Sequence, residues 1–396
     1  MWFISGHKTG RTFLIEMDPW KDEINAPFKK YERGSDEYNP FIEVEVDKND
    51  AVKQLNSNFR NKNLAFINMM VSQFESKRKA AQFAKSRENK TGLLNSNKLW
   101  ATKLTEDIFL SNTIVPDGKN HGMIMVVDFS GSMYDKFSET IEQLLVQVSF
   151  CKKVNIPFEV YSFTEEHWGD DKKYLVENQK EDDIKITDAG LKINKLISSD
   201  MTPAKYKSAF NGLLTIATAY GSSFDYKITN AGLPFISRLD IPVHLRMGGT
   251  PLAETILLLR DIAINFRQKN NIDVLNTLFL TDGSNTGMLD IGQQSFGSFK
   301  GATQKDAVVI KEGGMTTYHR AQNKYYSLRL SDLICQALIK HYDATTGSRT
   351  INYFLSNYQK SDLKTKFYNV NGYDETKFEK QYKAEWLTDG FMQIDG

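Results

Sequence analysis

Three small oxygen-bearing side chains follow an apolar run in MIMVVDFSGSM, residues 123–133. They are Asp128, Ser130 and Ser132, spaced at alternate positions around a glycine. A hydrophobic core has no use for a carboxylate and two hydroxyls so close together, because each buried polar group needs a partner. Carboxylate and hydroxyl oxygens are ligands for hard cations such as Mg²⁺ or Mn²⁺. The spacing therefore predicts a metal site whose other ligands lie elsewhere in the chain.

Two further stretches supply oxygen ligands of the same kind. In GGTPL, Thr250 stands where an N-cap is expected, with Pro251 at the first helical position, and in TDG, Asp282 ends an apolar run. In an open α/β sheet, the loops at the carboxyl ends of the strands meet at one edge, where ligands bind. We therefore expect five side chains to meet at that edge, namely Asp128, Ser130, Ser132, Thr250 and Asp282.

The segments that must position these side chains alternate between strand and helix patterns. Buried strands are predicted at 122–129, 157–164, 274–281 and 349–356, helices at 138–154, 202–220, 248–269 and 328–342, and a hairpin at 307–320. The first strand, helix and second strand form a crossover whose length implies parallel neighbouring strands. The pattern therefore predicts an α/β fold.

The flanking segments are less regular. Residues 1–118 read as an N-terminal extension of short strands followed by helices, and a polar stretch at 56–63 could divide its helical part in two. Residues 165–201 are polar and charged and predict a surface insertion or lid, while 358–396 form a tail with helical pieces but no assigned role. The central domain is expected at 119–357.

Composition excludes several function classes. Lys and Arg total 50 against 49 for Asp and Glu, so the charge gives no argument for a nucleic acid or membrane partner. The two cysteines, Cys151 and Cys335, lie in apolar helical patterns typical of reduced, buried thiols. No stretch approaches the roughly 18 apolar residues of a membrane span, and the N-terminus has no signal-peptide core. We expect a cytoplasmic protein.

Catalytic interpretations find little support in the sequence. A serine nucleophile at Ser130 or Ser132 would need a base, and the histidines show no spacing that assigns one; they are His7, His121, His167, His244, His319 and His341. No P-loop motif occurs, so any ATP hydrolysis would belong to a partner. We therefore expect no catalytic residues. A simpler alternative, in which the serines and Thr250 only cap helices, predicts each feature separately but not their conjunction.

The motifs DFSGS, GGTPL and TDG, in this order, resemble the metal-ion-dependent adhesion site (MIDAS) of von Willebrand factor type A (VWA) domains. The resemblance covers roughly residues 120–357. It implies a doubly wound, mainly parallel sheet with helices on both faces. It also implies that Ser130, Ser132 and Thr250 supply hydroxyl ligands to Mg²⁺, while Asp128 and Asp282 ligate directly or through water.

A closer resemblance is to the VWA proteins related to the cobaltochelatase subunit CobT, including versions carried by tailed bacteriophages. It rests on KTGLLNSNKLWATKLTEDIF at 90–109, NHGMIMVVDFSGSM at 120–133 and FCKKVNIPFEVYSFT at 150–164. It implies an adaptor that works with a ring-forming AAA+ ATPase of the MoxR or CobS type, in the host cytoplasm if the chain is phage-encoded. The long acidic stretch of bacterial CobT is absent.

Three function hypotheses follow. In the first, the metal binds a Glu or Asp of a protein partner, most simply the ATPase. In the second, the chain is a divalent-metal hydrolase or a chelatase component in which the ion activates water. In the third, it is a phage or cellular assembly protein whose metal only stabilises the fold. The first is preferred, because no base is placed for the second.

Overall fold

The structure is a computed structural model that describes residues 2–6, 11–17, 19–20, 24, 26–33, 41–84, 87–94, 109–114, 120–166, 190–220, 232–242, 245–282, 302–304, 307–312, 315–320, 330–354, 364, 367 and 374–386. At its centre is a seven-stranded sheet of order β1-β2-β9-β8-β7-β10-β14. Its strands are β1 (Trp2–Gly6), β2 (Arg11–Met17), β7 (His121–Asp128), β8 (Phe158–Glu166), β9 (Gly190–Ser198), β10 (Val274–Thr281) and β14 (Ser348–Phe354).

The sheet is mixed but mostly parallel. β7 runs parallel to both β8 and β10, β10 runs parallel to β14, and β2 runs parallel to β9. β8 and β9 pair antiparallel, as do β1 and β2. The parallel crossover expected from the sequence is therefore confirmed, and so is the α/β class.

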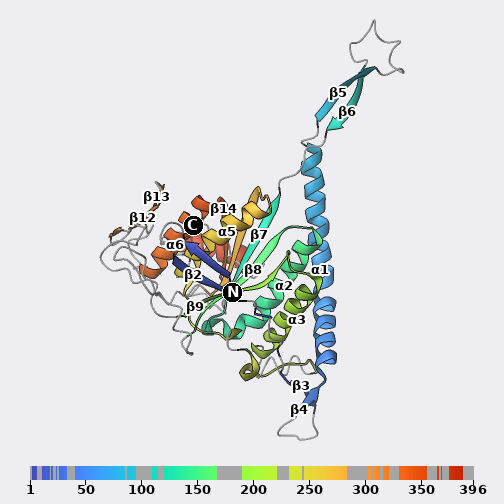
Figure 1. The fold of residues 1–396 in the computed structure, drawn as a ribbon, viewed down its shortest axis with the longest axis vertical. Helices are drawn as coiled ribbons and strands as arrows, with labels where there is room; N and C mark the ends of the chain where they lie inside the picture. The colour runs from blue at the N-terminus through green and yellow to red at the C-terminus, as the bar shows by residue number, and fades with distance from the viewer. Residues whose placement is uncertain are drawn as a thin grey trace.

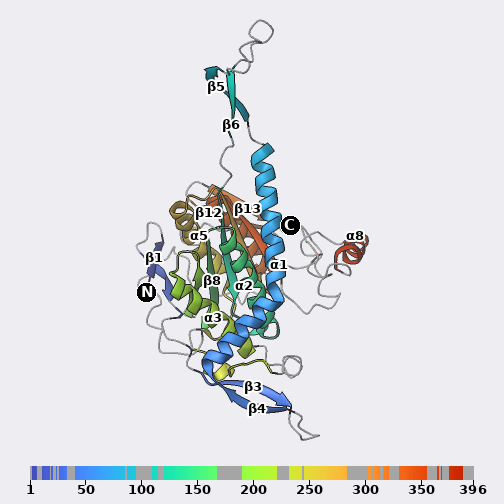
Figure 2. The ribbon, with the colours of Figure 1, turned by 90° about the vertical axis from the view of Figure 1, so that its right-hand side faces the viewer.

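Helices cover the sheet, as Figures 1 and 2 show. They are α1 (Lys48–Ala84), α2 (Phe137–Lys153), α3 (Pro203–Tyr220), α5 (Leu252–Lys269) and α6 (Leu330–Thr346). A further helix, α8 (Glu375–Gln381), lies apart from the sheet in Figure 2. β7 contributes to two cores, because successive side chains of a strand point to opposite faces. Met125 and Val127 join the core built with α1, α2 and α3, whereas Ile124 and Val126 join the core built with α5 and α6.

Smaller elements surround this body. Short sheets are formed by β3 (Phe28–Arg33) with β4 (Phe41–Val46), by β5 (Arg87–Leu94) with β6 (Phe109–Ile114), and by β11 (Ala302–Gln304), β12 (Ala307–Glu312) and β13 (Met315–Arg320). The β12–β13 pair confirms the hairpin predicted at 307–320. Figure 1 shows β5 and β6 beyond the C-terminal end of α1, away from the main sheet. None of the helices in the described ranges is long and apolar enough to cross a membrane.

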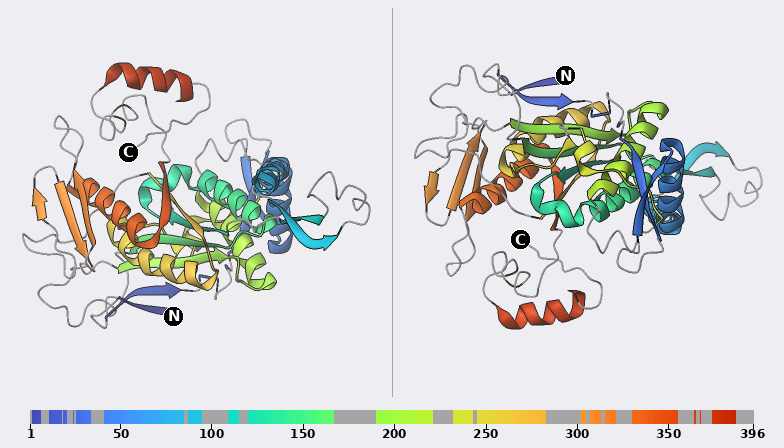
Figure 3. Two further views of the ribbon diagram at one scale, coloured as in Figure 1. Left: turned by 90° about the horizontal axis from the view of Figure 1, so that it is seen from above. Right: turned by 90° about the horizontal axis from the view of Figure 1, so that it is seen from below.

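The break expected at 56–63 does not occur, because α1 is one continuous helix. Its polar residues there are held by neighbouring helices. The Asn56 side-chain amide donates to Asn211 Oδ1 on α3 at 2.9 Å, and the Asn63 amide donates to Glu142 Oε1 on α2 at 2.7 Å. Figure 3 shows α1 end-on beside α2 and α3. The polar residues that suggested a loop are therefore contacts between helices.

The surface insertion predicted at 165–201 is corrected over its last part, because 190–198 form β9 within the sheet. Its charged residues concealed the strand. The Lys195 amine lies 2.7 Å from Glu159 Oε1, and Tyr161 donates to the other oxygen of the same carboxylate at 2.7 Å. Such pairing lets charged side chains occupy a covered sheet face. Residues 167–189 lie outside the described residues.

The N-terminal strands β1 and β2 form one edge of the sheet. Trp20, which follows them, packs against α3 at Gly212. A Cβ atom at Gly212, in the middle of α3, would lie only 2.1 Å from a ring carbon of Trp20. The Trp20 indole N–H in turn donates to the backbone oxygen of Leu196 on β9. Gly212 is therefore required for close packing of Trp20 against α3.

We predict that Gly212→Ala destabilises the fold by about 1–3 kcal/mol, because the indole must move. In an ordinary helix interior the same change would stabilise by about 1 kcal/mol. Urea unfolding of both proteins measures the difference. In a Trp20→Ala background the change should become neutral or stabilising. Stabilisation in the wild-type background would contradict the packing.

Candidate metal centre

The carboxyl end of β7 places Asp128 beside β10. Leu280 pairs with Val127 in the parallel register, so the next residues along each strand, Thr281 and Asp128, are neighbours. The Thr281 hydroxyl donates to Asp128 Oδ2 at 2.7 Å. This contact fixes one carboxylate oxygen and leaves the other to face a different direction.

Backbone hydrogen bonds hold the loop after β7 against the segment that precedes α5. The Gly131 amide donates to the Gly248 carbonyl, and the Gly248 amide donates to the Phe129 carbonyl, both at 3.0 Å. The Thr164 hydroxyl donates to that same Phe129 carbonyl at 2.8 Å. Thr250 follows Gly248 by two residues. The pairing therefore brings two predicted motifs together that are far apart in the sequence.

The predicted ligands form a buried floor and an open rim. Asp128, Ser130 and Thr250 are 0%, 1% and 2% exposed. Ser132 is exposed and Asp282 is half-buried. The Ser130 and Ser132 hydroxyl oxygens lie 3.0 Å apart, close enough to share one ligand. An ion on this floor would therefore keep an accessible side.

Thr250 does not occupy the N-cap position of α5, and Ser130 makes no capping hydrogen bond. The N-cap of α5 is Pro251, and the helix begins at Leu252, one residue later than predicted, because the ψ of Pro251 is 63° and not helical. Ser130 stands at the N-cap of the short helix η2 (Gly131–Lys136), but its side chain makes no capping hydrogen bond. The simpler explanation, in which these residues only cap helices, therefore gains no support at these two positions.

Burial makes the charge of Asp128 costly in the absence of a cation. Desolvation raises the pKa of Asp128 from 3.8 to about 7; Thr281 and Ser130 lower the pKa, but only in part, and the nearby Asp282 raises it further. The Oδ1 atom is buried and accepts no hydrogen bond from the described residues. A buried carboxylate with one unused oxygen is a group that a bound cation would stabilise.

The donor set fits a hard divalent cation. In the described part of the chain no three His, Cys, Asp or Glu side chains gather as a metal-binding group. Hydroxyl oxygens, which those four residue types do not have, make up most of the predicted set. Oxygen-only ligands favour Mg²⁺ or Mn²⁺, which retain several waters. The structure holds the Asp128 loop beside the Gly248 segment, with Asp282 directly after β10; direct ligation by the five residues stays a prediction.

No protein-family model, curated protein or solved structure matches this chain. The function must therefore be argued from the residues and their geometry.

One residue of the site was not predicted from the sequence. Thr281 was given no role there, although it precedes Asp282 in the TDG motif. A hydroxyl at a strand end beside a predicted aspartate ligand was the signal that could have identified it.

We predict that Mg²⁺ raises the melting temperature more at about pH 8 than at about pH 6, because metal and proton compete for Asp128. Burial raises the folded-state pKa from 3.8 to about 7, so the metal-free fold takes up a proton between these values that the unfolded chain does not. The destabilising effect of the carboxylate is therefore full above about pH 7 and is lost as the pH falls toward about 4. Thermal melts with Mg²⁺ and with EDTA measure both effects. Equal Mg²⁺ effects at both pH values would contradict the assignment.

Proposed function

We propose that residues 119–357 form a VWA-type domain with a doubly wound sheet, and that its metal site binds a carboxylate of a protein partner. The single observation that carries the proposal is the pairing of the Asp128 loop with the Gly248 segment around a buried carboxylate oxygen. The order of DFSGS, GGTPL and TDG supports it, as do α2 and α3 on one side of β7 and α5 and α6 on the other.

The chemistry of such a site is that of a binding device. Hydroxyl ligands are neutral, so an Mg²⁺ ion held by them and by few carboxylates keeps much of its positive charge. The open rim at Ser132 and Asp282 leaves a position for an incoming ligand. A Glu or Asp carboxylate from another protein matches that position in both charge and hardness. Neither a nucleophile nor a general base is needed.

A pocket beside the loop after β7, which carries Ser130 and Ser132, supports a protein as the ligand. It has a volume of about 780 Å³ and is lined in part by Gly131, Tyr134 and Leu239. Leu239 is 81% exposed, and the Arg238 guanidinium lies 4.7 Å from the centre of the Tyr134 ring. Exposed apolar and aromatic groups next to an arginine are typical of protein-binding sites. The pocket would contact residues flanking the acid that reaches the metal.

The proposed partner is a ring-forming AAA+ ATPase of the MoxR or CobS type, for which the chain acts as an adaptor toward a client. This assignment rests on the resemblance to CobT-like VWA proteins, including those of tailed bacteriophages. An assembly protein with a structural metal would share the ion but not the metal-dependent association, whereas a chelatase component would be recognised by turnover. Metal dependence of partner binding therefore separates the adaptor from the assembly protein.

The experiment is affinity capture from the native cell lysate in Mg²⁺ and in EDTA, with bound proteins identified by mass spectrometry. Asp128→Ala removes the central ligand, and Asp135→Ala, an exposed acid in η2, is the matched control. We expect an AAA+ ATPase with the wild type and with Asp135→Ala, in Mg²⁺ only. An identical set of proteins with Asp128→Ala, or in EDTA, would contradict the metal bridge. Turnover by the purified chain alone would favour the enzyme hypothesis.

A further inference from the structure

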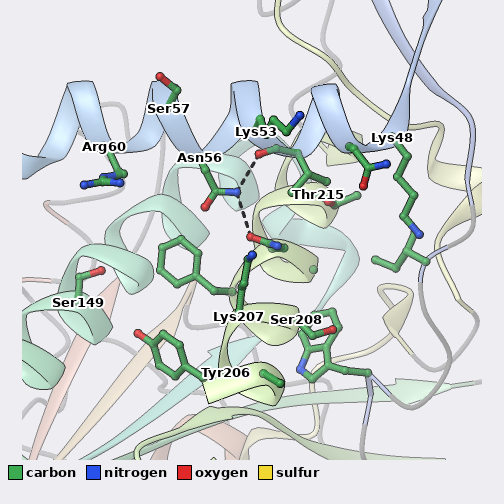
Figure 4. Close-up of a pocket in the computed structure, with 18 of the residues that line it drawn as sticks. Lys48, Lys53, Asn56, Ser57, Arg60, Ser149, Tyr206, Lys207, Ser208 and Thr215 are labelled. Atoms are coloured by element: carbon green, nitrogen blue, oxygen red, sulfur yellow. Dashed lines mark hydrogen bonds between the residues drawn. The ribbon is translucent and has the colours of Figure 1, made fainter. Parts of the chain in front are cut away.

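A second concave surface lies between α1 and the helices α2 and α3, and none of the five predicted metal ligands lines it. It is a groove of about 1290 Å³, shown in Figure 4. Six cationic side chains line it, namely Lys48, Lys53, Arg60, Lys152, Lys153 and Lys207. Among the described residues that line it there is no Asp or Glu. The groove is therefore locally positive in a chain whose net charge is only +1.

The two cations best placed for an external ligand are Arg60 on α1 and Lys207 on α3. Both are exposed, and within the described ranges no hydrogen bond or ion pair is found for either. Figure 4 shows Lys207 extending from α3 toward α1, with Arg60 farther along α1. By contrast, Lys53 lies 3.1 Å from Asp50. The uncompensated charge is thus concentrated on facing helices, as an anionic ligand requires.

The same groove also presents apolar and amide groups. Leu64 is 38% exposed there, and the Tyr206 ring forms part of the lining beneath the Lys152 amine, which lies 3.1 Å from the ring centre. Partial burial lowers the pKa of Lys152. Asn49 and Asn61 add side-chain amides that suit a peptide backbone. A lining that combines cations with apolar groups matches a ligand that is both acidic and amphipathic.

We propose that this groove binds an acidic, amphipathic peptide segment of a protein partner. A peptide fits better than a nucleic acid, because the positive charge is confined to one groove of a nearly neutral chain. Nucleic-acid binding draws on an extended series of phosphate contacts. Acidic side chains would pair with Arg60 and Lys207, while apolar ones would contact Leu64 and Tyr206. Because none of the five predicted metal ligands lines the groove, we expect binding here not to require Mg²⁺.

The test uses a randomised 12-residue peptide library displayed on phage, selected against the full chain and against Arg60→Glu/Lys207→Glu. A selected peptide is then labelled, and its affinity is measured by fluorescence anisotropy. The matched control is Lys77→Glu/Lys79→Glu, which makes the same charge change on exposed residues of α1 outside the groove. A labelled 12-nucleotide single strand of DNA is measured in parallel.

Selection by the wild type should enrich peptides that combine Asp or Glu with Leu or Phe. Their affinity should fall at least about tenfold in the groove variant and stay within about twofold in the control, because reversed charges repel the ligand. EDTA should change nothing, which separates this surface from the metal site. Peptides without acidic enrichment, or equal binding by the groove variant, would overturn the proposal. Tighter binding of the DNA than of any peptide would assign the groove to nucleic acid instead.

Discussion

Without divalent ions, the Asp128→Asn protein should be more stable than the wild type. The wild-type carboxylate is fully buried, and its pKa is raised from 3.8 to about 7 mainly by desolvation. Above about pH 7 the fold must hold this charge without a cation, at a free-energy cost of up to about 4 kcal/mol. An asparagine keeps an oxygen for the Thr281 hydroxyl and removes the charge. The asparagine amide also brings N–H donors that need partners in this buried position. The gain in stability of about 4 kcal/mol is therefore an upper limit.

Mg²⁺ should reverse the order of the two proteins. The wild type gains stability by binding the ion, whereas the variant has lost the ligand at the buried floor and should gain little. Thermal and urea unfolding at about pH 8, with Mg²⁺ or with EDTA, measure both effects. A variant that is less stable than the wild type in EDTA would show that the carboxylate serves the fold alone. A variant that responds fully to Mg²⁺ would exclude Asp128 as a ligand.

Phe137→Ala should both destabilise the fold and weaken metal binding. Phe137 opens α2, is fully buried, and meets the Phe129 and Tyr220 rings edge-on, each at 4.8 Å between ring centres. Phe129 lies between the predicted ligands Asp128 and Ser130, in the loop after β7. Truncation of a buried phenylalanine costs about 3–5 kcal/mol. Loss of this support should also let the loop move away from its paired position beside Gly248.

The matched control is Phe150→Ala, near the other end of α2. Phe150 is 8% exposed and contacts Phe74 of α1 edge-on at 5.6 Å between ring centres. The Phe150→Ala substitution should lower the free energy of unfolding without changing the affinity for Mg²⁺. Urea unfolding and isothermal titration calorimetry measure the two quantities separately. Equal losses of Mg²⁺ affinity in both variants would mean that the loop is not held by Phe137 in particular.

The parts of the fold that sequence alone could predict depend on local patterns. The strand that ends in Asp128, the helix after it and the hairpin at 307–320 all follow from apolar periodicity or turn residues. The metal-ligand candidates could be proposed because strand ends in this fold class converge. Local patterns, however, give no information about which distant segments pair.

The features missed in the sequence all depend on such distant contacts. β9 was hidden because Lys195 needs Glu159 on the neighbouring strand to occupy its position. The continuity of α1 depends on contacts such as the hydrogen bond from the Asn63 amide to Glu142 on α2. The candidate site contains the same kind of contact, since Thr281 at the end of β10 donates a hydrogen bond to Asp128 at the end of the neighbouring strand β7. Side chains that look like loop or surface residues by type can thus be structural once their partners are known.

The measurement that tests the metal site most directly is a Mn²⁺ titration followed by electron paramagnetic resonance, with wild type, Asp128→Asn and Thr250→Ala in parallel. Mn²⁺ shares the oxygen ligands of Mg²⁺, and its free aqueous signal is lost on binding. The wild type should bind about one Mn²⁺ that excess Mg²⁺ displaces, and both variants should bind far more weakly. A wild type that leaves the free Mn²⁺ signal unchanged, or variants that bind as it does, would contradict the site.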